Sequence, residues 1–228
     1  MTESMRRYGV IFDMDGVLVD SYHPHFESWR QLAEENDLQM TETQFAHQFG
    51  RTSREIIRSL WGEGISDETI ATLDRRKESL YREIILKDIP VCEGLLELLS
   101  DLAADGATMA VGSSGPPENV DAVLDGLNIR HYFSAVITGM DVARGKPDPQ
   151  VFLLAAERMG IAPLHCAVIE DAPAGLKAAH NAQMKAIGIT TSHPRDRLCE
   201  TDLIISSLTE LNGSRVRELI FRRQEKSF

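Results

Sequence analysis

The hydrophobic positions of this chain follow two different periods in successive stretches. Residues 8–15, YGVIFDMD, are largely apolar over the length of a buried strand. From about residue 23 to 88 the apolar positions recur at the spacing of amphipathic helices, and they include Phe26, Trp29, Leu32, Ala33, Ile56, Ile57, Leu60, Ile70, Leu73, Leu80 and Ile84. The segment DIPVCEG, residues 88–94, carries a proline and a glycine and predicts the end of this helical stretch.

Beyond residue 94 the pattern predicts alternating helices and strands. Helices are expected near residues 94–105, 117–127, 149–159 and 173–182, and strands over 107–114, 133–139, 166–172, 184–190 and 202–206. Such alternation is typical of right-handed crossovers and of a parallel sheet that helices cover on both faces. We therefore predict an α/β fold: a Rossmann-like parallel-sheet core, residues 1–22 and 89–228, with an inserted helical domain, residues 23–88. Residues 215–228 are expected to form an amphipathic helix with a solvated basic end.

Composition narrows the kinds of partner. The chain has 228 residues with 24 basic and 35 acidic side chains, and its net charge of −11 argues against binding to nucleic acid or to an anionic membrane. No run approaches roughly 18 consecutive apolar residues, and the start MTESMRRYG lacks the apolar stretch of a signal peptide. Cys92, Cys166 and Cys199 are far apart and odd in number, which favours a reducing compartment. We expect a cytoplasmic, monomeric protein whose partner is a small molecule.

Polar residues gather where the predicted strands end. In an open parallel sheet the carboxyl ends of the strands share one edge, and binding sites form there. The polar residues at or just after four of these strand ends are Asp13, Asp15, Ser113, Ser114, Lys146, Glu170 and Asp171. Four carboxylates in one crevice would raise each other's pKa or need a cation between them. Oxygen ligands of this kind favour a hard divalent cation, most simply Mg²⁺.

Each of these features has a common structural alternative. The D-x-D pair could begin a calcium loop, but an EF-hand needs glycine at the sixth position and glutamate at the twelfth, whereas Gly16 is fourth and Pro24 twelfth. Ser113 alone could be a turn residue or a helix cap, and the acids at residues 170–171 could cap a following helix. A lone lysine is usually solvated. The functional interpretation rests on finding all these residue types, in order, at four separate strand ends.

Four short segments carry a family resemblance. The segments DMDGVLVDS, VGSSG, GKPDP and VIEDA, in this order and spacing, resemble the signature segments of the haloacid dehalogenase superfamily. The helical stretch after the first segment resembles the cap domain of its β-phosphoglucomutase-like branch, which contains sugar-phosphate phosphatases and phosphomutases. The resemblance covers almost the whole chain and implies a Rossmann-like core, an α-helical cap and a dependence on Mg²⁺.

The resemblance implies roles for the two aspartates of the first segment. Asp13 would be the nucleophile that accepts the phosphoryl group, and Asp15 would protonate the leaving alcohol and later deprotonate water. The metal would be bound by the carboxylates of Asp13 and Asp171 and the backbone carbonyl of Asp15. Glu170 would add to this set directly or through water. Superfamily dehalogenases and phosphonatases lack a carboxylate at the position of Asp15, so its presence indicates phosphate esters as substrates.

The resemblance also implies how the phosphoryl group is held. The Ser113 hydroxyl and the backbone N–H groups of Ser114 and Gly115 would donate to phosphoryl oxygens. Lys146 would hold both Asp13 and the transferring group. Such a set supplies in-line positioning and charge neutralisation, which phosphoryl transfer requires.

Substrate choice is expected to come from the helical domain. His25, Arg54 and Lys77 match positions that face the active site in the resembled branch. Taken singly, a histidine near a helix start, an arginine after a capping Ser53 and a lysine in a charged run are usually surface residues. As a group we interpret them as substrate-binding, with Arg54 facing a second anionic or hydroxyl-rich end of the substrate. Lys77 and His25 could position hydroxyls or assist proton transfer involving Asp15.

Three functions stay open at this point. Mutases of the branch carry a Lys-Asn pair after the second segment to hold the non-reacting phosphate, whereas this chain reads SSGPPEN, where Asn119 matches but the cation is replaced by Pro116, Pro117 and Glu118. We therefore expect a phosphatase that hydrolyses a small phosphate ester such as a sugar phosphate, with a phosphomutase as the alternative. A catalytically idle binding or regulatory protein is disfavoured, because a binder has no need for both aspartates of the first segment.

Overall fold

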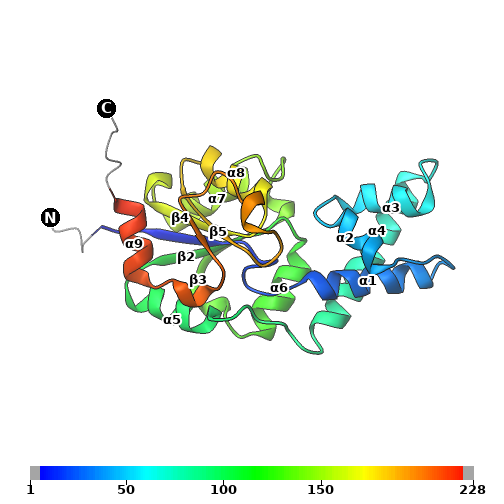
Figure 1. Ribbon diagram of the computed structural model, residues 1–228, viewed down its shortest axis with the longest axis horizontal. Helices are drawn as coiled ribbons and strands as arrows, with labels where there is room; N and C mark the ends of the chain where they lie inside the picture. Colours follow the sequence, from blue (N-terminus) through cyan, green and yellow to red (C-terminus); the bar gives the residue numbers. More distant parts are fainter. Residues whose placement is uncertain (1–5, 223–228) are drawn as a thin grey trace. The chain divides into compact units, whose positions relative to one another are not determined.

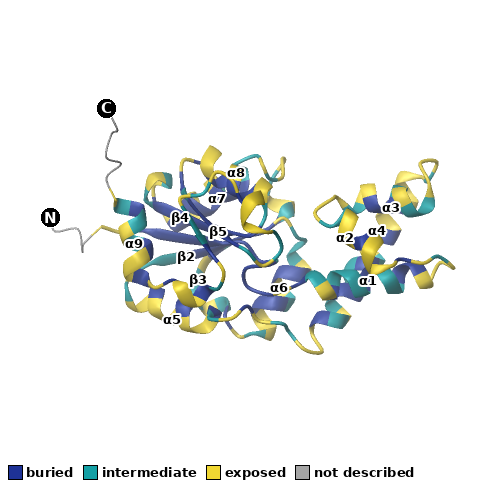
Figure 2. Cartoon of the chain, in the orientation of Figure 1, coloured by how far each residue is buried: buried dark blue, intermediate teal, exposed yellow. Residues whose placement is uncertain are grey.

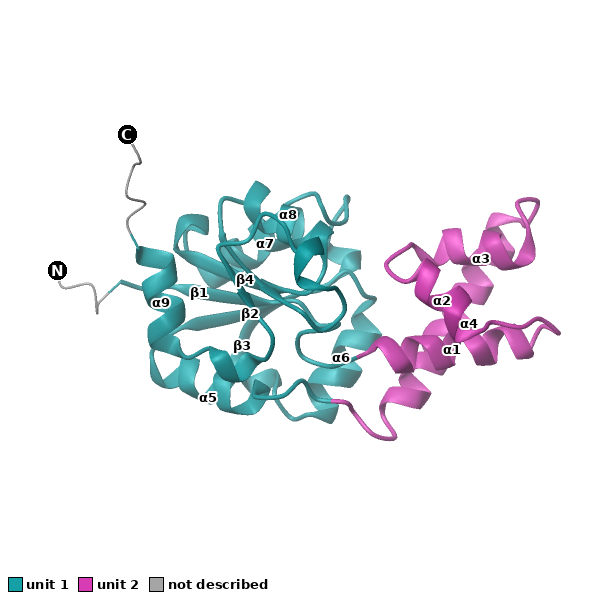
Figure 3. Ribbon diagram, viewed as in Figure 1, with its two compact units in different colours: residues 1–20, 91–228 teal, residues 21–90 magenta. Residues whose placement is uncertain are grey.

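The chain forms two compact units in the computed structural model, which describes residues 6–222. One unit contains the chain up to Asp20 and from Val91 onward, and the other is Ser21–Pro90 (Figure 3). We expected the boundaries between the two units after residues 22 and 88; in the structure the boundaries follow Asp20 and Pro90.

The first unit contains a six-stranded parallel sheet in the order β3-β2-β1-β4-β5-β6 (Figure 1). Its strands are β1 (Gly9–Phe12), β2 (Thr108–Gly112), β3 (Phe133–Ile137), β4 (Cys166–Glu170), β5 (Lys185–Ile189) and β6 (Leu203–Ile205). The helices are α5 (Leu95–Ala104), α6 (Pro117–Gly126), α7 (Gln150–Met159), α8 (Pro173–Asn181) and α9 (Gly213–Phe221). The predicted α/β fold with a parallel sheet is confirmed.

The central position of β1 determines where a site can form. β1 pairs with β2 on one side and β4 on the other, so the strand order reverses next to it, and the carboxyl ends of these three strands meet. All four residues of β1 are buried, and helices α7 and α8 pack on the face where Ile11, Ala110 and Val168 join one hydrophobic cluster. Figure 2 shows buried central strands and helices whose outer faces are exposed. A rigid, fully buried strand therefore leads into the first polar segment.

The strands are shorter than the hydrophobic pattern predicted. We expected strands to include residues 13–15, 113–114 and 171–172, but β1, β2 and β4 end at Phe12, Gly112 and Glu170. The expected strands were too long because the polar residues leave the sheet. Only one further ladder bond continues from each of the first two strands, Asp13 N–H to the Ile169 carbonyl (3.0 Å) and Ser113 N–H to the Ile137 carbonyl (2.9 Å).

The second unit is entirely helical. Its elements are α1 (Tyr22–Glu34), α2 (Glu42–Gln48), α3 (Ser53–Trp61) and α4 (Asp67–Ile85), and Trp29, Ile57 and Leu80 belong to its common hydrophobic cluster. Helix α3 begins with a capping box between Thr52 and Glu55. The cap is thus Thr52 rather than the expected Ser53, which is the first helical residue.

Two expectations concern the ends of the chain and membranes. Helix α9 ends at Phe221, and residues 223–228 of the expected basic helix lie outside the described residues, as do residues 1–5. Across residues 6–222 no helix combines the length and the apolar character that crossing a membrane would take.

Candidate active site

The segment after β1 makes a tight turn that fixes the direction of its two aspartates. Gly16 has φ +71°, its N–H donates to the Val19 carbonyl (2.8 Å), and the Leu18 N–H donates to the Met14 carbonyl (2.8 Å). Met14 and Leu18 are fully buried, so the apolar residues between and after the aspartates anchor the turn in the core. The buried apolar residues around Asp13 therefore hold this aspartate in a fixed position at the end of β1. This explains why an aspartate stands within an apolar run.

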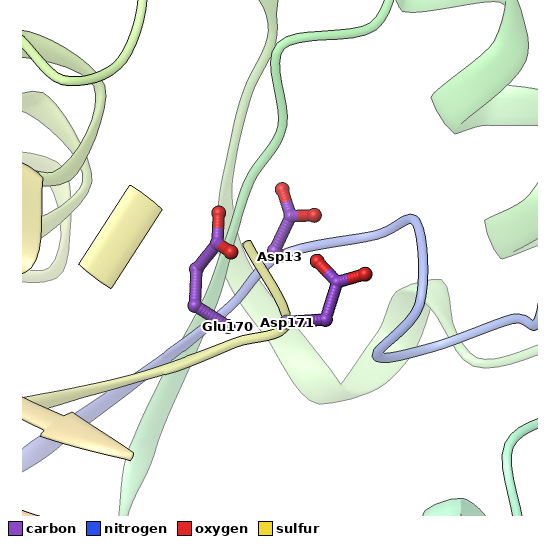
Figure 4. A group of neighbouring side chains, drawn as sticks. All are labelled: Asp13, Glu170 and Asp171. Carbon is purple, nitrogen blue, oxygen red and sulfur yellow. The ribbon is translucent and has the colours of Figure 1, made fainter. Parts of the chain in front are cut away.

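Three carboxylates converge at the ends of β1 and β4. Asp13, Glu170 and Asp171 are 7%, 1% and 5% exposed, and each offers an oxygen within 4.8 Å of the others. Figure 4 shows the three side chains rising from adjacent backbone segments, with their carboxylates turned to the same region. The pairing of Phe12 with Ile169 places the next residues of both strands side by side. The strand register thus brings together three of the four carboxylates that were predicted to meet, and Asp15 is not a member of this group.

Lys146 is the positive partner of this cluster. Its Nζ donates to Asp13 Oδ1 at 2.6 Å and to Glu170 Oε1 at 2.7 Å, and it lies 4.9 Å from the centre of the Phe152 ring. The side chain is 8% exposed. The expectation that a lone lysine is solvated does not hold here, because two buried carboxylates and an aromatic face surround the ammonium group.

The charges of the cluster are out of balance. Burial raises the pKa of Asp13 to about 7, the attraction of Lys146 opposes this, and the charges of Glu170 and Asp15 add to the rise. Burial and the neighbouring carboxylates also raise the pKa of Asp171 well above its ordinary value. For Lys146, burial lowers the pKa, but Asp13 and Glu170 outweigh it and the pKa is raised. One ammonium does not neutralise three carboxylates, and an all-oxygen set with excess negative charge fits a hard divalent cation.

Glu170 is already engaged by the chain itself. Its Oε1 accepts from Lys146, and its Oε2 accepts from the Ala172 N–H at 2.7 Å, just before α8 begins at Pro173. A Cβ at Gly175 would lie 1.7 Å from Glu170 Oε1, so only glycine leaves room for this side chain. Helix α8 has no side-chain cap hydrogen bond, so Glu170 does not fill the capping role that we considered; it holds Lys146 and the Ala172 amide just before the helix.

The second segment forms a loop between β2 and α6. Ser113 is 1% exposed, and its Oγ accepts from the Gly115 N–H at 3.0 Å. The Gly115 carbonyl accepts a hydrogen bond from the Gly139 N–H at 3.0 Å. A Cβ at Gly139 would lie 2.4 Å from the Ser114 carbonyl oxygen. Asn119 is buried near the start of α6. The loop is closely packed, and an anion that took the Gly115 amide would replace its bond to the Ser113 hydroxyl.

The helical unit brings together two of its three predicted residues. Lys77 Nζ lies 2.9 Å from His25 Nδ1 and 3.0 Å from Glu78 Oε1, and the His25 ring stacks on Tyr81 with centroids 4.2 Å apart. The Lys77 side chain is 4% exposed, so the view of it as a solvated lysine in a charged run is wrong. The run forms a helix, and Lys77 falls on its buried face.

Arg54 has different partners within the same unit. Its Nη1 donates to Asp67 Oδ1 at 2.7 Å, and its side chain is half-exposed. Its ion pair with Asp67 joins the start of α3 to the start of α4.

Two residues of the first unit escaped the sequence analysis. Ser192 Oγ and Asp171 Oδ2 both lie against the backbone of Gly16, and Thr191 Oγ1 donates to the Gly16 carbonyl. Thr191 and Ser192 follow β5 at the same sheet edge as the other polar segments. The signal was present in the run TTSH directly after the apolar strand MKAIGI, but hydroxyl residues after a strand also occur in ordinary turns.

Comparisons with known proteins agree on one family. The family model for haloacid dehalogenase-like hydrolases matches residues 9–183. A validoxylamine A 7′-phosphate phosphatase from Streptomyces hygroscopicus subsp. limoneus is 30% identical over 208 residues, covering 88% of this chain and 94% of that protein. The β-phosphoglucomutase of Bacillus subtilis strain 168 is 31% identical over 209 residues, covering 89% and 90%. A solved HAD hydrolase of family IA, variant 3, from Entamoeba histolytica superposes with a TM-score of 0.86 at 26% identity, covering 93% of this chain and 99% of that chain.

Gly175→Ala tests the packing of Glu170. The added Cβ meets a carboxylate that two hydrogen bonds hold in place, so we expect a loss of about 1–3 kcal/mol in the free energy of unfolding, measured by urea denaturation. Gly64→Ala is the matched control, since a Cβ there meets nothing within 4 Å. Equal stability of the two variants would contradict the tight packing.

A pH-dependent response to Mg²⁺ tests the charge imbalance. The pKa of Asp13, about 7, lies above the value of about 3.9 in an unfolded chain, so ionisation of this group in the metal-free protein lowers stability as pH rises through 7. A divalent cation needs the ionised carboxylates and reverses this loss. Mg²⁺ should therefore raise the melting temperature more at pH of about 8 than at about 5.5. A shift that is equal at both pH values, or that persists unchanged in Asp171→Asn, would refute the cation site.

Proposed function

The chain belongs to the haloacid dehalogenase-like hydrolases, in their β-phosphoglucomutase-like branch, and we propose that it is a Mg²⁺-dependent phosphatase of a small phosphorylated metabolite such as a sugar phosphate. The observation that carries the proposal is the bridge from Lys146 to Asp13 and Glu170 beside Asp171. This bridge holds the buried carboxylate of Asp13 at the place where the four polar segments were expected to meet. Asp15 follows Asp13 two residues further on. The similarity to the validoxylamine A 7′-phosphate phosphatase supports a phosphorylated small molecule as the substrate.

Asp13 is the proposed nucleophile. One of its carboxylate oxygens attacks phosphorus in line with the ester oxygen, the P–O bond to the leaving alcohol breaks, and an aspartyl-phosphate forms. Asp15 gives its proton to the leaving alkoxide. Water then attacks the phosphorus, Asp15 takes up a proton from it, and inorganic phosphate leaves as the Asp13 carboxylate is restored.

The other core residues hold charge in place. Lys146 binds Asp13 Oδ1, and this favours the ionised carboxylate that the attack needs. The Ser113 hydroxyl and the amides of Ser114 and Gly115 donate to phosphoryl oxygens. To bind a phosphoryl oxygen, the Gly115 amide exchanges its present bond to the Ser113 hydroxyl for a bond to the substrate.

The metal would be held by the carboxylates of Asp13 and Asp171 and by the backbone carbonyl of Asp15. When bound, Mg²⁺ supplies positive charge that neutralises the ionised carboxylates and the phosphoryl oxygens. Both oxygens of Glu170 already accept hydrogen bonds from Lys146 and Ala172, so Glu170 would add to this set directly or through water.

The helical unit is the proposed source of specificity. His25 and Lys77 form a pre-organised pair against Tyr81, suited to substrate hydroxyls or to proton transfer with Asp15. Arg54 offers a planar fork to an anionic or hydroxyl-rich end of the substrate, in place of its present partner Asp67. Asn119 is the remaining candidate near the phosphate loop.

Hydrolysis is favoured over phosphomutase action. The similarity to a β-phosphoglucomutase supports the alternative. Against it, Pro116, Pro117 and Glu118 occupy the stretch where the mutases of this branch have a cation for a second phosphate. A carboxylate at that place would repel the non-reacting phosphate of a bisphosphorylated intermediate.

The compartment and the assembly are proposals of a simpler kind. Cys92, Cys166 and Cys199 are all free thiols, which suits the cytoplasm. We propose a monomer that works on a diffusible substrate, without nucleic acid or membrane as a partner.

Asp15→Asn should separate the two proton-dependent roles from phosphoryl transfer itself. The variant cannot protonate a leaving group, so activity on an alkyl phosphate should fall by about 10²–10⁴-fold and activity on p-nitrophenyl phosphate far less, as measured by phosphate release. Asp13→Asn, by contrast, should abolish both. Equal losses on both substrates in Asp15→Asn would argue against the acid role, and full turnover in Asp13→Asn would disprove the nucleophile.

Incubation with β-glucose 1-phosphate and a trace of the 1,6-bisphosphate distinguishes phosphatase from mutase. We expect free phosphate to appear faster than glucose 6-phosphate, because a second cationic phosphate site is lacking in SSGPPEN. Coupled assays of both products from the same reaction give the ratio. Faster formation of glucose 6-phosphate would establish the mutase alternative instead.

A further inference from the structure

The ammonium group of Lys146 lies over an aromatic ring as well as beside two carboxylates. Its Nζ is 2.6 Å from Asp13 Oδ1, 2.7 Å from Glu170 Oε1 and 4.9 Å from the centre of the Phe152 ring. A cation at this distance is attracted by the negative charge of the ring face. Phe152 lies in the first turn of α7 and is fully buried. The ring is therefore an uncharged partner of the ammonium group.

The Phe152 ring packs tightly against the sheet. A Cβ at Gly112, the last residue of β2, would lie 3.0 and 3.1 Å from two carbon atoms of this ring and 3.2 Å from Ile11 Cγ2. Helix α7 itself packs on β1, β2 and β3. The ring therefore keeps its place when the lysine side chain moves.

The backbone that carries Lys146 is fastened separately. Gln150 Oε1 accepts hydrogen bonds from the N–H groups of Ala143 at 2.9 Å and Arg144 at 3.1 Å, which ties this loop to the start of α7. These bonds fix the loop but not the end of the lysine, because its four-carbon stem is flexible. The position of the ammonium group therefore depends on its own contacts.

We propose that Phe152 is a positioning residue for Lys146 during phosphoryl transfer. The inference rests on the proposed function, in which Asp13 is the nucleophile. When an oxygen of Asp13 forms its bond to phosphorus, the negative charge of the carboxylate is lost and its attraction for Lys146 weakens. The charge distribution of the ring face stays the same throughout the reaction. Phe152 thus keeps the ammonium group beside the phosphoryl group while the ion pair with Asp13 is weakened.

An aromatic partner also leaves a hydrogen-bond donor for the substrate. An ammonium group has three N–H bonds. Within residues 6–222, Asp13 and Glu170 accept two of them, and the attraction to a ring face needs no acceptor atom. The third N–H is then available to a phosphoryl oxygen. A polar side chain in place of Phe152 would compete for this donor.

A purely structural role of Phe152 has a different signature. The residue belongs to the hydrophobic cluster of Ile11 and Val168, and a side chain that only fills this core acts through its size and shape. The proposed role depends on the electron density of the ring face. Ring fluorines withdraw that density and change the shape of the ring little. A series of fluorinated phenylalanines at this position therefore separates the two roles.

The test replaces Phe152 of the full chain with phenylalanines that carry increasing numbers of ring fluorines. The value of kcat/KM for p-nitrophenyl phosphate, with Mg²⁺ present, should fall step by step, by about 3- to 30-fold in all. Phe152→Leu, which removes the ring and keeps an apolar side chain, should lose activity to a similar extent. Urea denaturation checks that each variant is folded.

The same fluorinated series at Phe133 is the matched control. The Phe133 ring packs against that of Phe12 with centroids 5.9 Å apart, in the same unit. Phe133 is the first residue of β3, at the amino end of the strand and away from the edge where the site lies. Fluorination there should produce no trend in kcat/KM.

Constant kcat/KM across the Phe152 series, or an equal fall in both series, would overturn the inference and leave the phosphatase proposal intact. A folded Phe152→Leu variant with full activity would overturn it as well. If Phe152→Leu does not fold, the fluorinated series decides, since it preserves the packing. A natural chain without turnover of p-nitrophenyl phosphate would instead remove the proposed function, and with it the reaction in which Phe152 acts.

Discussion

Three buried carboxylates beside one ammonium group dominate the electrostatics of the candidate site. Asp13, Glu170 and Asp171 each offer an oxygen within 4.8 Å of the others, and Lys146 bonds to the first two. Such a cluster is costly in a folded chain unless protons or a cation balance it. The raised pKa values of Asp13 and Asp171 are the sign of that imbalance. A site with this charge is prepared for a divalent cation and for a substrate that brings its own phosphate.

The fold explains why the cluster cannot relax by moving apart. Asp13 follows a strand that is buried on all sides, and its neighbour Met14 is anchored in the core. Glu170 is confined by Gly175 and bonded at both oxygens, and Asp171 lies against Gly16. Close packing, rather than any single bond, keeps the like charges together. The glycines at these two contacts are as necessary to the site as the acids themselves.

The sequence predicted the sheet and the core of the site well because both depend on periodicity and topology. Once the strands are parallel and β1 lies between β2 and β4, the polar residues that follow them must meet at one edge. The ends of the strands were misplaced because a polar residue can continue a strand or leave it; after β1, the turn around Gly16 takes the chain out of the sheet. Thr191 and Ser192 were missed because they contact Gly16, far away in the sequence, and no local pattern encodes such a contact. The burial of Lys77 was missed for a similar reason, since its partner His25 lies far away in the sequence.

The most direct measurement is the anomalous scattering of Mn²⁺, as a substitute for Mg²⁺, in crystals of the protein. A single strong peak should lie between the carboxylates of Asp13 and Asp171, at about 2.0–2.3 Å from an oxygen of each, with Lys146 still bonded to Asp13. Crystals that show the acids turned away from one another, or a fully occupied ion bound elsewhere while this cluster stays without one, would contradict the idea that a shared cation organises the site.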